Sequence, residues 1–367
     1  MNPKVILLLT PLLLSNCYLV RQSITFLSYQ RRAVPVEKLV NDTTVNDSIV
    51  SFLTLTDSIR TYAREALGLS LNKNFTTFIE TDKRAIVTVV TACAADTFRQ
   101  HTWWYPIVGS MPYKGFYRAD DAFAEAEKLN REGLDVAVRP AGAFSTLGFF
   151  RDPLYSYMTR YSRYRLASMI IHEQVHATLF LKSRADFNEA MAVFIGDQAA
   201  LGYIRRSHGE SSGQFELAKR RHQDEQTYVD LLLGLYSELD SIYSLNIPTD
   251  SILNLKRNAI TDFKGRYEAH YDSLFATQRY RGIAGRTINN AMLCELKTYH
   301  HDVSIFAKLY RHFHSDMPRM IEFLKSIPAN EKQPYRIIES ELQSKADGDA
   351  DESLEGKLKG VPTKESK

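Results

Sequence analysis

The stretch from Ser162 to Phe180 constrains the fold of this chain more than any other. It has the pattern of a helix and contains the pentapeptide H-E-Q-V-H at residues 172–176. It contains no glycine or proline, and its apolar residues recur at helical spacing. Histidines four residues apart lie on one face of a helix, with Cβ atoms about 5–6 Å apart. The stretch therefore predicts a helix on which His172 and His176 reach one metal ion.

Glu173 follows the first histidine directly, the position that H-E-x-x-H helices use for a general base toward water. A solvated helix face with two histidines and a glutamate is the alternative. It fits poorly beside Ile170, Ile171 and Val175, which predict a buried helix. We expect one zinc ion per chain, with Glu173 as the catalytic base.

The third ligand must come from elsewhere, because a catalytic zinc usually takes three protein ligands. Leu179 and Lys182 occupy the positions of the glycine and the last histidine of the metzincin motif, so that class is excluded. A polar, turn-like connection instead leads to N-E-A-M-A at residues 188–192, and a second helix can fold back there. Glu189 is the predicted third ligand.

An alternative remains open for Glu189. D-F-N-E at residues 186–189 also matches a capping box, in which Glu189 would bond to the backbone amide of Asp186. The third ligand would then be Asp186 or Asp197.

Phe187, Asn188 and Glu189 behind this H-E-x-x-H resemble the bacterial family described as predicted aminopeptidases, which are often lipoproteins. Further similar blocks follow the family order: W-Y-P-I-V-G at 104–109 with Y-K-G-F-Y at 113–117, G-L-D-V at 133–136 with A-F-S-T-L-G-F-F at 143–150 and D-P-L at 152–154, and N-N-A at 289–291 with Tyr299. Together the blocks span about residues 17–315. Ala177 departs from the pattern, in which a glutamine follows the second histidine. The resemblance implies a gluzincin-like zinc metallopeptidase.

The last of these blocks contains the candidate for a second catalytic group. Tyr299 is the expected donor to the tetrahedral oxyanion, with a core tyrosine as the alternative. Asn289 and Asn290 either line the pocket or cap the helix that begins there.

The function predicted from these residues is zinc-dependent hydrolysis of peptide bonds, and the resemblance implies an aminopeptidase. The Gly-x-Met-x-Asn exopeptidase signature of one large gluzincin group is absent, so endopeptidase activity stays open. The alternative is a catalytically silent, membrane-anchored binding or scaffold lipoprotein that keeps the zincin fold.

The N-terminus has the pattern of a lipoprotein signal. Val5 to Leu14 is an apolar run of about ten residues, too short to span a bilayer and typical of a signal peptide. L-S-N-C at residues 14–17 approximates a lipobox, although Asn16 is unusual there. We expect a signal peptide over residues 1–16, a lipid anchor on Cys17 and a periplasm-facing location at the cell envelope. Tyr18 after the cysteine favours the outer membrane; a secretory signal or an uncleaved anchor is the alternative.

Cys93 and Cys294 carry less information. Two buried free thiols are expected, with a disulfide in an oxidising compartment as the alternative. Their spacing does not support a metal site. The formal charge of +3 with signs mixed along the chain argues against a nucleic-acid partner.

The predicted fold is α+β and predominantly helical, with a small sheet, a thermolysin-like zincin core and a long antiparallel helix pair. The expected elements are a helix at 59–67, a sheet at about 84–138 with strands at 84–90, 103–108 and 134–138, a helix at 119–131, zinc helices at 162–200 and the helix pair at 215–275. One catalytic domain is expected over residues 17–340, followed by a disordered charged tail at 341–367.

Overall fold

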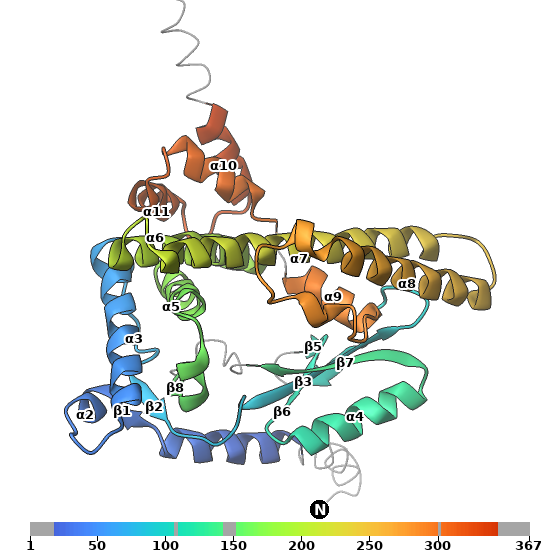
Figure 1. Cartoon of the computed structure of the whole chain (residues 1–367), viewed down its shortest axis with the longest axis horizontal. Coiled ribbons are helices and arrows are strands. Elements are labelled where there is room, and N and C mark those ends of the chain that lie inside the picture. The colour runs from blue at the N-terminus through green and yellow to red at the C-terminus, as the bar shows by residue number, and fades with distance from the viewer. Residues whose placement is uncertain (1–17, 106–108, 142–151, 300–301, 344–367) are drawn as a thin grey trace, which may run out of the picture. The chain divides into compact units, whose positions relative to one another are not determined.

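The computed structural model describes residues 18–105, 109–141, 152–299 and 302–343 of the chain (Figure 1). These residues form a predominantly helical protein with three small sheets, which confirms the predicted α+β class. The signal peptide, Cys17, the block at 143–150 and the tail from residue 344 lie outside the described residues.

The chain forms two compact units, each assembled from three segments. The first unit comprises the described residues of 1–55, 73–162 and 208–300, and the second those of 56–72, 163–207 and 301–367. The sheets and the long helix pair belong to the first unit. Residues 172–189, with the candidate ligands, belong to the second.

All three sheets are small. In the first, β3 is the central strand between β6 and β7, both antiparallel to it. In the second, β2 pairs antiparallel with β1 and parallel with β8, and β4 and β5 form an antiparallel pair. The strands are β1 (Val34–Pro35), β2 (Thr77–Ile79), β3 (Val87–Ala94), β4 (Trp103–Tyr105), β5 (Gly109–Met111), β6 (Lys114–Phe116), β7 (Leu134–Ala141) and β8 (Leu154–Tyr155).

Helices account for most of the remaining structure. They are residues 18–31, α2 (Val36–Val40), α3 (Asp47–Glu65), α4 (Ala119–Arg131), α5 (Arg163–Thr178), α6 (Ala185–His208), α7 (Gly213–Tyr243), α8 (Thr249–Leu274), α9 (Asn290–Tyr299), α10 (Ser304–His312), α11 (Met317–Ser326) and residues 334–343, with 3-10 turns at Ser156–Arg160 and Arg281–Ile283. Residues 341–343, which we expected to begin the tail, are therefore helical.

Both faces of β3 are covered, because most of its residues on either side of the sheet are apolar. Val90 and Ala92 pack with residues of α4, whereas Cys93 packs with Ala291 and Cys294 of α9. The two helices lie on opposite sides of the sheet (Figure 1). Alternate strand residues point to opposite faces, so β3 is the centre of a three-layer core.

The helix pair α7 and α8 forms as the sequence predicts, and the two helices run side by side (Figure 1). Leu232, Leu235 and Leu239 of α7 are buried in one apolar cluster with Phe263 and Tyr267 of α8. These residues recur every three or four positions, which gives each helix one apolar face. Pro248 is the N-cap residue of α8.

The predicted elements differ from the observed ones mainly in length. The helix at 119–131 has the predicted bounds, whereas the strand expected at 84–90 extends from Val87 to Ala94. Of the strand expected at 103–108, residues 103–105 form β4 and 106–108 lie outside the described residues. We did not predict β1, β2, β5, β6 or β8, because strands of two or three residues show no periodic pattern.

Candidate metal centre

Helix α5 is buried on most of its circumference. Leu166, Ala167, Ile170, Ile171 and Val175 are at most 1% exposed. Their burial fixes the rotation of the helix, because its apolar residues leave few alternatives. The two histidines occupy the side that remains partly open.

His172, His176 and Glu189 converge in the second unit. The Nε2 atoms of the two histidines lie 3.1 Å apart. Oε2 of Glu189 lies 3.5 Å from Nε2 of His172, and Oε1 of Glu189 lies 3.3 Å from Nε2 of His176. Among the described residues, these three form a group that could hold a metal ion.

The three separations fit a zinc ion. Nitrogen and oxygen ligands about 2.0–2.1 Å from zinc, at the tetrahedral angle, lie about 3.3–3.4 Å from one another. The two histidine nitrogens are 3.1 Å apart, and one oxygen of the Glu189 carboxylate lies 3.3 Å from His176 while the other lies 3.5 Å from His172, all close to this value. Two imidazoles and one carboxylate are also the donor set of zinc sites that keep a fourth position open.

The carboxylate of Glu189 is presented by the first turns of α6. This helix begins at Ala185, earlier than a capping box with Asp186 as N-cap would require. Glu189 instead lies against the two imidazoles. Of the two reserve ligands, Asp197 accepts a hydrogen bond from Ser168 Oγ at 2.6 Å, and Asp186 is outside the group of three.

Asn188, beside the candidate ligand, holds the connection between α5 and α6. Its side chain is buried and makes both hydrogen bonds to Leu181: Oδ1 accepts from the backbone nitrogen at 3.0 Å, and Nδ2 donates to the carbonyl at 2.8 Å. The chain also adopts a positive φ of 57° at Ser183. Asn188 therefore stabilises the turn that brings Glu189 back to the histidines, a role that we did not predict.

Gly196 lets α6 approach α5 at the first histidine. A Cβ atom at this position would lie 3.0 Å from the carbonyl oxygen of Ser168 and 3.2 Å from Cβ of His172. Both distances are shorter than ordinary contacts. The spacing of the two ligand helices therefore depends on the missing side chain.

Residues 70–72 hold α5 in place through hydrogen bonds to its residues. Gln174 is fully buried and exchanges two hydrogen bonds with Asn72: it accepts from the backbone nitrogen and donates to Oδ1, both at 3.2 Å. Asn72 Nδ2 donates to the carbonyl of Glu173 at 3.3 Å, and Ser70 N donates to Thr178 Oγ1 at 2.8 Å. The sequence carried no signal for this contact, because the partners are about a hundred residues apart.

The carboxylates of Glu189 and Glu173 change the pKa of His176. Burial alone would lower the pKa of His176, but the hydrogen bond and charge of Glu189, with the charge of Glu173, raise it above its ordinary value. The charge of Glu173 therefore acts on the same imidazole as the charge of Glu189.

The other predicted site residues lie in the first unit. Tyr299 is the last residue of α9, and its side chain lies outside the described structure, so its catalytic role stays a prediction. Asn289 caps α9, because its Oδ1 accepts from Met292 N at 3.1 Å. Its Nδ2 donates to Val136 O at 2.9 Å, and the residue also lines a cleft of about 1020 Å³.

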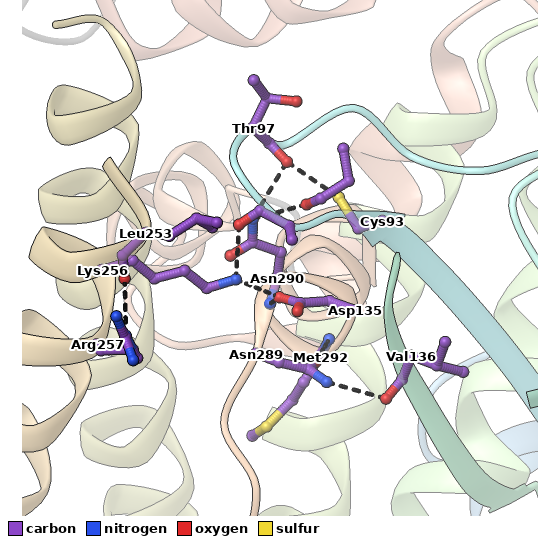
Figure 2. Close-up of polar contacts among 12 residues, drawn as sticks. Cys93, Thr97, Asp135, Val136, Leu253, Lys256, Arg257, Asn289, Asn290 and Met292 are labelled. Atoms are coloured by element: carbon purple, nitrogen blue, oxygen red, sulfur yellow. Dashed lines mark hydrogen bonds and ion pairs between the residues drawn. The ribbon is translucent and has the colours of Figure 1, made fainter. Parts of the chain in front are cut away.

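Asn290 is fully buried and binds three segments together (Figure 2). Its Nδ2 donates to Ala94 O at 2.9 Å, and its Oδ1 accepts from Tyr243 OH at 2.8 Å. Its backbone nitrogen donates to Asp135 Oδ2 at 2.8 Å, and the same oxygen pairs with the buried ammonium of Lys256. The role of Asn290 is therefore structural within this unit, and the sequence had not pointed to Lys256.

The fold and the site together define an α+β, mostly helical protein with a centre of two histidines and a carboxylate. The chain matches the family described as "Putative aminopeptidase" over residues 17–336, and it belongs to that family. This confirms the predicted aminopeptidase family. No curated protein and no solved structure matches the chain. Within the described residues, no helix combines the length and apolar character needed to cross a membrane.

Proposed function

We propose that this protein is a zinc-dependent metallopeptidase of the gluzincin type that acts as an aminopeptidase. The observation that supports it best is the convergence of His172, His176 and Glu189, whose ligand atoms can all lie within 4.8 Å of one another. Membership of the aminopeptidase family supports a peptide as substrate. The chain order of small sheet, H-E-x-x-H helix and ligand helix resembles that of thermolysin-like domains, which supports the gluzincin type.

A zinc ion held by these residues would polarise the scissile carbonyl and lower the pKa of water at the site. Glu173 would take the proton of the attacking water and pass it to the leaving amine. Tyr299 remains the proposed donor to the oxyanion.

Exchange of Glu173 for glutamine tests the chemistry apart from the fold. The side chain keeps nearly the same volume but can no longer accept a proton. Glu173→Gln is expected to retain zinc and thermal stability, while peptide hydrolysis falls by about two to four orders of magnitude. Glu127→Gln on α4, where the side chain is 72% exposed, is the matched control and should keep full activity. A zinc-loaded, fully active Glu173→Gln enzyme would contradict the mechanism.

Removal of a ligand tests the metal site. Elemental analysis of the wild-type protein is expected to give one zinc per chain. His172→Ala and Glu189→Ala should lose both metal and activity, because two protein ligands then remain. Unchanged zinc affinity in Glu189→Ala would remove Glu189 from the site. Bound zinc in the wild type without turnover of any peptide in a diverse library would favour the silent scaffold.

We further propose that the protein is a lipoprotein of the bacterial cell envelope, facing the periplasm. The apolar run at residues 5–14 and the cysteine at position 17 support this, and the family match begins at Cys17. Radiolabelled fatty acid is expected to enter the wild-type chain but not Cys17→Ser. Equal labelling of both chains, or of neither, would contradict it.

A further inference from the structure

The helix of residues 18–31 in the first unit is fixed to the protein along one face (dark blue in Figure 1). Tyr18 donates a hydrogen bond to a backbone carbonyl of β6. Gln22 Oε1 accepts from Tyr117 N at 3.0 Å, and the buried ring of Tyr29 stacks on that of Tyr117 at 5.9 Å. At about 100° per residue, these three anchoring side chains lie within about 40° of one another. The rotation of the helix is therefore set.

The opposite face carries apolar side chains in contact with solvent. Val20, Ile24 and Leu27, the apolar stripe, are 52%, 63% and 47% exposed. Together with the exposed Arg31 they fall within about 60° around the helix and lie roughly opposite the anchored face. Single exposed apolar residues need no explanation, but an aligned row of them forms a contiguous apolar surface that a partner or a membrane can cover.

The position of this helix in the chain points to a lipid surface. Its first residue directly follows Cys17, and the apolar run at 5–14 ends only a few residues earlier. A residue spans at most about 3.3–3.6 Å of chain. An acyl chain on Cys17, or an uncleaved anchor, would therefore hold the start of the helix within about 15 Å of the bilayer. The anchored face is occupied by the protein, so the apolar stripe is the face left for lipid.

We propose that the apolar stripe lies in the headgroup region of the membrane, with Arg31 directed to anionic phosphates. This rests on the proposed lipid anchor and adds an orientation to it. Helices that lie in the interface bury one apolar face about 5–10 Å into the headgroup boundary. The acyl chains supply the affinity, and the stripe holds the first unit in one orientation against the bilayer.

Fluorescence at two matched leucines tests this proposal. Leu27 is 47% exposed on the stripe, and Leu245, between α7 and α8, is 46% exposed. Leu27→Cys and Leu245→Cys would be introduced separately into the full chain, purified in acylated form and labelled with an environment-sensitive fluorophore. The proteins would then be reconstituted into vesicles of phosphatidylethanolamine and phosphatidylglycerol that contain a doxyl-labelled lipid. Intact mass would establish acylation of Cys17.

Quenching at position 27 is expected to exceed that at position 245 severalfold, with a blue-shifted emission at position 27 alone. Ile24→Asp in the Leu27→Cys background should reduce this quenching while the protein stays on the vesicles. An acylated chain whose label at 27 behaves as the label at 245 would refute the apolar stripe and leave the lipid anchor intact. An unacylated chain that does not sediment with the vesicles would refute both.

Discussion

Gly196→Ala should change the stability of the protein through two opposing effects, a gain in helix propensity and a loss from overpacking. In a helix interior, alanine is normally favoured over glycine by about 1 kcal/mol. Here the added Cβ would meet the carbonyl oxygen of Ser168 at 3.0 Å and Cβ of His172 at 3.2 Å. The carbonyl is part of α5 and cannot rotate away, so α6 must move outward by a few tenths of an ångström. Overpacking of this kind costs about 1–3 kcal/mol.

The matched control is Gly265→Ala in α8. Nothing lies within 4 Å of a Cβ atom at Gly265, so this variant measures the gain in helix propensity alone. It is expected to stabilise the protein by about 1 kcal/mol. The two variants should therefore differ by the overpacking cost, about 1–3 kcal/mol, in urea unfolding with zinc removed.

The same substitution should weaken metal binding, because it displaces the helix that carries Glu189 from the helix that carries His172. Changes next to metal ligands typically cost about 10–100-fold in affinity. Competition with a chromogenic chelator would measure the zinc affinity of wild type, Gly196→Ala and Gly265→Ala. If Gly196→Ala stabilised the protein as much as Gly265→Ala and bound zinc with unchanged affinity, Gly196 would not set the helix spacing.

Three further outcomes are expected. Chelation of zinc should lower the melting temperature, because a ligand at a hundredfold excess over its Kd adds about 2.7 kcal/mol to stability; calorimetry should show little such loss in Glu189→Ala. Burial raises the pKa of Asp152 to about 6. The native state therefore keeps a proton that the unfolded chain loses near pH 4, and this contribution to stability declines as the pH rises from about 4 to about 6. Asp152→Asn should remove the decline in unfolding measured across that range, and an unchanged profile would contradict the assignment. Oxidised glutathione should join Cys93 and Cys294 in a disulfide, because their sulfur atoms lie 3.2 Å apart; the glutathione takes up the two protons and two electrons. Both thiols would then resist alkylation in the denatured chain. Continued alkylation of both would show that they do not pair.

The sequence by itself determined the parts of this protein that depend on near neighbours in the chain. Apolar residues at helical spacing, with no glycine or proline among them, predicted the helix α5. The i, i+4 spacing predicted that His172 and His176 lie on one of its faces. The short polar connection after them was enough to predict a returning helix with Glu189. Helix α4 and the pair α7 and α8 were predictable for the same reason, because each has its own apolar face.

Only the tertiary structure decided which side chains support these elements. Gln174 with Asn72, and Asn290 with Ala94, pair residues about a hundred or more positions apart, and no local period specifies such partners. The same holds for the parallel pair of β2 and β8, which are too short to show a pattern. It also holds for Val20, Ile24 and Leu27, whose spacing fits a buried face equally well. Their exposure follows from the anchoring of the opposite face, which is a property of the folded chain.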